Sequence, residues 1–262
     1  MMVKIFAIFE LTVKKVKEPA FSILFVIAAL VGYFVSGMGK LQFGKNDDIL
    51  FGLISLEQGD PLLIGFIVIL LMTLIVATFG GATDIPKDID SRMIMLILGK
   101  PVTRSEYLLG KYFGVVAICL TFFLVASIAA FAGHLINTGE CIAFSVLIRQ
   151  LVLMLILFPF VAMTMMISAY LSDISAMIIA IVYVIFSVAI SAFSVFIDML
   201  PKSLEVVSVV HTIAYLLPNY FYFFSSFKYT GLVMISLVVY AFSMTVIFLS
   251  IAAFRLNHRD ML

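Results

Sequence analysis

Four glycine–lysine pairs are the first candidates for chemistry in this sequence, because a Gly-Lys step ends the loop that binds nucleotide phosphates. That loop has the spacing Gly-x-x-x-x-Gly-Lys and continues with Ser or Thr. The four pairs here continue with Leu41, Asn46, Pro101 and Tyr112, so none of them fits. The chain also lacks His-Glu-x-x-His and Gly-x-Ser-x-Gly. The sequence therefore predicts no catalytic residue and no ATPase motif in this chain.

Soft metal ligands are a second candidate, since the chain has 15 Met, three His and two Cys. His134, Glu140 and Cys141 lie close together, but their spacing matches no known metal site, and a soft-metal site there is the minor alternative. Thioether side chains commonly fill gaps in apolar cores. We therefore interpret Met163, Met165 and Met166 as packing residues and predict no metal site.

The segment that follows Ala82 has residues typical of the start and the end of a short helix. Asp84 suits an N-cap, and Pro86 is tolerated in a first turn. Gly99 followed by Pro101 is typical of a helix end. The pattern predicts a helix over residues 84–98 that lies across the membrane face.

Residues 84–98 also combine charges with an apolar stripe at helical spacing, which suits a docking surface for another protein. Beyond it, Thr103 and Glu106 have the spacing of a capping box, which predicts the start of the next helix. A passive connector is the alternative, although the segment is long for one. The candidate contact residues are Asp84, Lys87, Asp88, Ile89, Asp90, Arg92 and Met93.

The composition excludes a soluble globular domain. The chain is 64% hydrophobic and 12% charged, with a mean hydropathy of +1.25, whereas soluble domains are about half apolar and a quarter charged. Its apolar residues fall in runs of about 20, the length that crosses a bilayer. We predict an all-α integral membrane protein, a single domain over 1–262, with six spans at about 20–36, 62–82, 107–132, 147–171, 174–197 and 231–254.

The N-terminal residues 2–18 predict an amphipathic elbow helix that lies in the membrane plane. A simple anchor and a helix that also touches a cytoplasmic partner are both open. Its polar face carries Lys4, Glu10, Lys14, Lys15 and Lys17.

Residues 202–228 are apolar but contain a proline and several tyrosines, which favours two short re-entrant helices between spans five and six over a seventh span. Backbone of this kind must face protein or a cavity. We expect a gate on the outer side of the membrane, formed by Leu216, Leu217, Pro218, Tyr220 and Phe221.

Lysine and arginine cluster in the N-terminal segment, in the loop after span two and at the C-terminus, which predicts that these three segments are cytoplasmic. The protein would then be a multi-pass protein of the cell (inner or cytoplasmic) membrane. A net charge of +1 indicates no nucleic-acid partner. The span cores hold almost no charged residue, which favours an externally powered machine over an ion-coupled transporter or an intramembrane enzyme.

The residues Leu98–Arg104 and Tyr107–Gly114, placed after an acidic helix start, resemble the type-2 (ABC-2) exporter permeases. The resemblance is closest to the subgroup containing the permease of the nitrous-oxide-reductase copper-maturation complex. It implies an elbow helix, six spans, re-entrant helices and a coupling helix that sits in a cleft of an ATPase subunit.

The resemblance also implies partners. These are a second permease copy in a homodimer, two ABC ATPase subunits that bind ATP and Mg²⁺, an accessory protein on the periplasmic or extracellular side, and membrane lipids. The function it implies is export, or force transmission across the membrane, driven by ATP. A non-transporting membrane scaffold or assembly factor is the alternative, and the cargo stays open.

Overall fold

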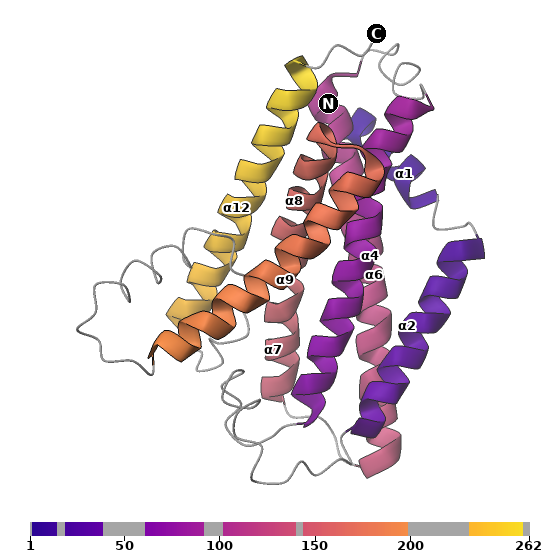
Figure 1. The fold of residues 1–262 in the computed structure, drawn as a ribbon. Helices are drawn as coiled ribbons and strands as arrows, with labels where there is room; N and C mark the ends of the chain where they lie inside the picture. The colour runs from indigo at the N-terminus through magenta and orange to yellow at the C-terminus, as the bar shows by residue number, and fades with distance from the viewer. Residues whose placement is uncertain are drawn as a thin grey trace.

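The computed structural model describes residues 2–14, 19–38, 61–91, 102–139, 144–198 and 231–258. These residues form helices and contain no strand, which confirms the all-helical class for the described part of the chain (Figure 1). The helices are α1 (Met2–Lys14), α2 (Pro19–Met38), α4 (Pro61–Asp90), α6 (Arg104–Thr138), α7 (Phe144–Met154), α8 (Leu157–Tyr170), α9 (Asp173–Asp198) and α12 (Gly231–His258).

Within the described residues, four helical stretches are long and apolar enough to cross a membrane: Val68–Asp90, Arg104–Thr138, Val146–Tyr170 and Met234–His258. Two shorter apolar stretches, Ile23–Phe34 and Asp173–Phe186, belong to α2 and α9. The chain is therefore a multi-pass membrane protein, and the count of six spans stays a prediction. The re-entrant segment 202–228, with its gate residues, lies outside the described residues.

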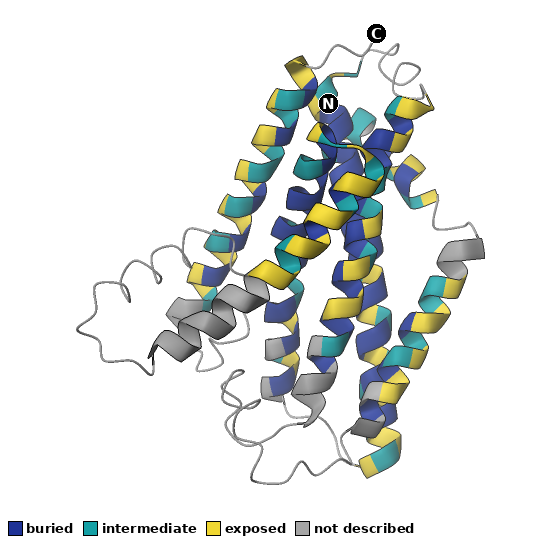
Figure 2. Cartoon of the chain, viewed as in Figure 1, coloured by how far each residue is buried: buried dark blue, intermediate teal, exposed yellow. Residues whose placement is uncertain are grey.

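Helix α6 is the central element, since it contacts α1, α2, α4, α8 and α12. Figure 2 shows buried residues concentrated on α4, α6 and α8, with exposed residues along the outer faces of α2, α9 and α12. Many of the exposed side chains are large and apolar, for example Ile128, Ile178 and Phe242. Such an outer surface suits contact with lipid and not with water.

The methionines predicted as packing residues lie in this core. Met163 and Met165 are 2% and 0% exposed, and Met166 packs against the same cluster. Both α4 and α9 contact α8, the helix that carries all three. Their burial in the core agrees with a packing role.

One predicted span, residues 147–171, is divided into α7 and α8 by a turn at Leu155–Ile156. The backbone N–H of each turn residue donates to the carbonyl oxygen three residues earlier, at 3.1 and 3.2 Å. Pro159 lies just after the turn and has no N–H to donate to Leu155, so the regular helical ladder is interrupted here. The proline therefore marks an interruption of the helix that the hydropathy pattern alone did not predict.

Gln150 of α7 forms a neutral polar contact with α6 inside the bundle. Its Nε2 atom donates to Ser127 Oγ, whose hydroxyl donates to the Phe123 carbonyl oxygen at 2.6 Å. Gln150 is 5% exposed, and its Oε1 atom has no hydrogen-bond partner among the residues that the structure describes. Within the described part of the chain, one acceptor of this buried amide is therefore unsatisfied.

The prediction that Asp84 caps a separate helix is wrong, because α4 continues without a break from Pro61 to Asp90 and contains Pro86. Asp84 and Asp88 both contact the neighbouring helix α6, so the backbone is held on both sides of the proline. Tertiary contacts therefore outweigh the local signal for a helix start. Residues 92–98 of the predicted coupling helix lie outside the described residues.

The predicted start of the next helix is confirmed. Thr103 is the N-cap of α6, its Oγ1 atom accepts from the Glu106 backbone N–H at 3.3 Å, and Glu106 Oε2 accepts from the Thr103 N–H at 2.9 Å. This reciprocal pair satisfies two backbone donors that a helix start leaves free. It fixes where α6 begins, and therefore where the side chains of its first two turns point.

Candidate functional site

Three helix ends meet at one end of the bundle: the end of α4, the start of α6 and the end of α12. Helix α1 packs on α6 at the same end (Figure 1). Arg104 of α6 donates through one guanidinium nitrogen to the carbonyl oxygens of Leu256 and Asn257 in α12, at 2.5 and 3.0 Å. These two carbonyl oxygens lie in the last turn of α12, where carbonyls have no N–H donor within the helix. The arginine thus ties the start of α6 to the end of α12.

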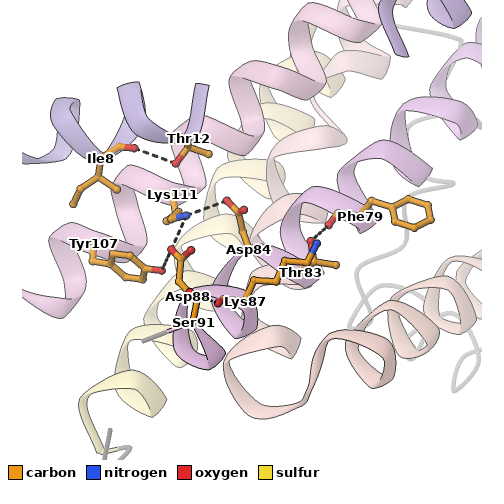
Figure 3. Close-up of polar contacts among 10 residues, drawn as sticks. All are labelled: Ile8, Thr12, Phe79, Thr83, Asp84, Lys87, Asp88, Ser91, Tyr107 and Lys111. Atoms are coloured by element: carbon orange, nitrogen blue, oxygen red, sulfur yellow. Dashed lines mark hydrogen bonds and ion pairs between the residues drawn. The ribbon is translucent and has the colours of Figure 1, made fainter. Parts of the chain in front are cut away.

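A buried ion-pair cluster joins α4 to α6 at this end, and Figure 3 shows its side chains converging. Lys111 Nζ lies 2.7 Å from Asp88 Oδ2 and 3.4 Å from Asp84 Oδ2. The Tyr107 hydroxyl donates to the same Asp88 oxygen at 2.7 Å. We call Asp84, Asp88, Tyr107 and Lys111 the ion-pair cluster.

The spacing of the cluster follows from helix geometry. Asp84 and Asp88 are four residues apart on α4, and Tyr107 and Lys111 are four residues apart on α6, so each pair lies on one face of its helix. The two faces meet where α4 ends and α6 begins. A contact of this kind fixes the rotation of both helices, because turning either one would separate all four groups.

Burial makes the ion-pair cluster energetically important. Asp84, Asp88 and Lys111 are 7%, 4% and 4% exposed, and Tyr107 is 1% exposed. Removing one partner of a buried ion pair typically destabilises a protein by about 3–5 kcal/mol, because the remaining charge is uncompensated. Here one ammonium faces two carboxylates, and the tyrosine hydroxyl provides a second donor to Asp88.

The cluster lies near the boundary of the apolar region. Helix α6 has 35 residues, which corresponds to about 52 Å of helix, whereas the bilayer core is about 30 Å thick. The first two turns of α6, which carry Tyr107 and Lys111, can therefore extend beyond the hydrocarbon. Charges are far less costly there than at the bilayer centre.

Helix α1 covers the cluster from the side. Its Ile8 packs on Tyr107, and both are nearly fully buried. A Cβ atom added to Gly110 would lie 2.7 Å from Ile8 Cβ, and one added to Gly114 would lie 2.5 Å from Thr12 Cβ. Helix α1 can reach α6 only because these two positions have no side chain.

The predicted docking residues divide into inward and outward groups. Asp84 and Asp88 belong to the ion-pair cluster, and Ile89 is partly buried against Ile8 and Tyr107. Lys87 and Asp90 are exposed. The other two predicted contacts, Arg92 and Met93, lie outside the described residues.

The predicted elbow residues are only partly described. Lys4 is half-buried, while Glu10 and Lys14 are exposed and form an ion pair of 2.8 Å within α1. Lys15 and Lys17 lie outside the described residues. An exposed pair of this spacing contributes little to stability, about 0.3–0.5 kcal/mol.

Sequence reasoning missed Tyr107 and Lys111 as site residues. Both residues enter the sequence analysis only within the stretch Tyr107–Gly114, which carries the family resemblance. Two signals were available: an acidic pair and a Tyr–Lys pair, each with a spacing of four, at facing ends of consecutive apolar helices. Their pairing needs the antiparallel arrangement of α4 and α6, which consecutive spans joined by a short loop adopt.

The charges of the ion-pair cluster are paired and shielded from water. No cluster of three or more His, Cys, Asp or Glu that could hold a metal occurs among the described residues. His134 lies in α6, whereas Glu140 and Cys141 lie outside the described residues. The arrangement suits mechanical connection between helices.

The comparison with known families covers nearly the whole chain. The family model described as ABC-2 family transporter protein matches residues 6–261. No curated protein matches the chain at a significant level.

Proposed function

The chain belongs to the ABC-2 transporter family and is therefore a permease component of an ABC transporter, and we propose that a separate ATPase subunit drives it through the end of α4. ATP and Mg²⁺ bind in that subunit. Two ATPase subunits act on a homodimer of this chain, with both termini on their side of the membrane. The work is export, or force transmission to an accessory protein on the far side.

The ion-pair cluster is the observation that supports this proposal. Because Lys111 holds both Asp84 and Asp88, the end of α4 and the start of α6 form one mechanical unit. Both helices contain stretches that are long and apolar enough to cross a membrane, Val68–Asp90 and Arg104–Thr138. A push on the segment that joins them therefore moves two spans together instead of bending the loop.

The surface that contacts the ATPase consists of those residues of this segment that do not pack inside the chain. Ile85 and Ile89 pack inside the protein, whereas Asp90 and Ser91 are exposed at the end of α4. We propose that Asp90, together with the following Arg92 and Met93, contacts the ATPase. Asp84 and Asp88 would act by holding this surface in place.

Co-purification of the ATPase with full-length chain in detergent tests this assignment. Met93→Asp would place a charge inside the contact and should abolish co-purification, because an unpaired buried charge is strongly unfavourable. Asp90→Arg should weaken it mainly through slower association. Thr138→Arg, an exposed position at the opposite end of α6, is the matched control and should leave the ATPase bound.

Membrane insertion must be measured for each variant. If well-inserted Met93→Asp and Asp90→Arg proteins still bind the ATPase and transport normally, the coupling assignment fails. A chain that forms no stable complex with an ATPase under any condition would instead support a membrane scaffold.

A further inference from the structure

A cavity of about 570 Å³ lies between α1, α2, α4 and α6, beside the ion-pair cluster. Most of its wall is apolar and comes from α2, α4 and α6, including Ile27, Met72, Ile75, Phe79 and Phe122. Ile27, Met72, Ile75 and Phe79 are 41–52% exposed, so the cavity opens on the outer flank of the bundle. Its size falls within the range of small-molecule sites, about 300–1,000 Å³.

One end of this cavity is polar. Thr12, Thr83, Asp84 and Lys87 line it there. The two threonine hydroxyls donate to their own helices, at the carbonyl oxygens of Ile8 and Phe79, and Asp84 pairs with Lys111.

Lys87 differs from these neighbours, because its ammonium forms no ion pair with any residue in the described part of the chain. Figure 3 shows its side chain extending back along α4 toward Thr83 and Phe79, and not beyond the helix end. The cavity therefore combines an apolar wall with one available cation at its end. That combination complements an amphiphile with a hydrocarbon chain and a negative headgroup.

We propose that this cavity binds one hydrocarbon chain of a resident anionic membrane lipid, whose headgroup contacts the Lys87 ammonium. The hydrocarbon chain of the lipid enters the cavity from the membrane, through the open flank between α2 and α4. The ion-pair cluster lies at the headgroup end, so the bound lipid contacts α4 next to Asp84. The site lies within one subunit and does not depend on an ATPase.

Native mass spectrometry of the full-length chain tests the site, with phosphatidylglycerol and phosphatidylcholine of identical acyl chains as probes. We expect one phosphatidylglycerol per chain to be retained at activation energies that remove phosphatidylcholine. Lys87→Gln should lower the apparent affinity for phosphatidylglycerol about fivefold, to the level of phosphatidylcholine. Lys14→Gln removes an exposed cation outside the cavity and should change nothing.

Ile75→Trp tests the apolar part, because a larger side chain on the exposed rim should occupy the cavity and reduce the binding of both lipids. Its thermal unfolding reports whether the fold is intact. Equal retention of the two lipids by the unchanged protein, or unchanged binding by Lys87→Gln, would mean unspecific surface lipid and overturn the proposal. Release of the lipid during ATP turnover by the complete complex would identify a cargo and overturn the assignment as a resident lipid.

Discussion

Helix α6 makes two buried polar contacts that differ in chemistry. At its first turns, Tyr107 and Lys111 form a charged cluster with α4. About four turns further on, Ser127 forms a neutral contact with Gln150 of α7. The charged contact lies at the end of the bundle, and the neutral one lies further along α6, within its apolar stretch.

The difference follows from the energetic cost of burying charge. A charged side chain at the bilayer centre is unfavourable by about 2.5–3.5 kcal/mol even on insertion scales, and a neutral amide is less so. The ion-pair cluster therefore lies at the end of the bundle, where it joins α4 rigidly to α6. The weak contact lies on α7, which is separated from α8 by the turn at Leu155–Ile156. We infer that one end of the bundle is fixed and that α7 can adjust.

The largest expected effect is at Lys111. Lys111→Met leaves two buried carboxylates without their cation and should lower the free energy of unfolding by about 3–5 kcal/mol. Chemical unfolding of the detergent-solubilised chain measures this loss. If the pairing is the cause, adding Asp88→Asn to Lys111→Met should recover part of the stability. An equally unstable double variant would show that the lysine packs and does not pair.

The close contact of α1 with α6 is the next test. Gly114→Val places a side chain where Thr12 now lies, so α1 should be displaced, with a loss of about 1–3 kcal/mol. The displaced helix should expose Ile8, and a cysteine placed there would react faster with a water-soluble thiol reagent. Gly139→Ala is a control at the C-cap of the same helix, where a Cβ atom meets nothing within 4 Å and the φ of 73° adds only local strain. Unchanged reactivity at position 8 would argue that α1 is held by other contacts.

Local signals carried much of the sequence prediction. The apolar runs identified the helices, and Thr103 with Glu106 identified the start of α6, because a capping box involves residues three apart. Burial of Met163 and Met165 followed from their place inside an apolar run. These features depend on neighbours in the chain, so no knowledge of tertiary contacts was needed.

The misassigned feature depended on contacts between helices. Asp84 followed by Pro86 has the local pattern of a helix start, but the partner that keeps Asp84 inside α4 is Lys111, 27 residues away. The same contact turned two predicted docking residues, Asp84 and Asp88, into buried ones. One sequence does not reveal which of its charges pair across helices.

Tyr107→Phe removes a single hydrogen bond from the ion-pair cluster and should therefore have a smaller effect. Hydrogen bonds to charged groups contribute about 1.5–3 kcal/mol, and Asp88 keeps its contact with Lys111, so we expect a loss near the lower limit. Unfolding of the double variant Tyr107→Phe/Lys111→Met shows whether the two losses in the free energy of unfolding add. Full additivity would contradict a single coupled cluster, because groups in one network interact.

The smallest expected effect is at the neutral contact. Gln150→Leu removes the donor to Ser127 but also removes the Oε1 atom, which lacks a partner among the described residues. Interhelical hydrogen bonds in membrane proteins contribute only about 0.6 kcal/mol on average. Loss of one bond and relief of one unsatisfied acceptor should nearly cancel, so the free energy of unfolding should change by less than about 1 kcal/mol.

Ser127→Ala removes the acceptor alone, leaves the Gln150 amide with no partner in this contact, and should be the more destabilising of the two. If Gln150→Leu instead destabilises the chain as much as Lys111→Met, α7 is held as firmly as the end of α4. The contrast between a fixed and an adjustable region would then be lost.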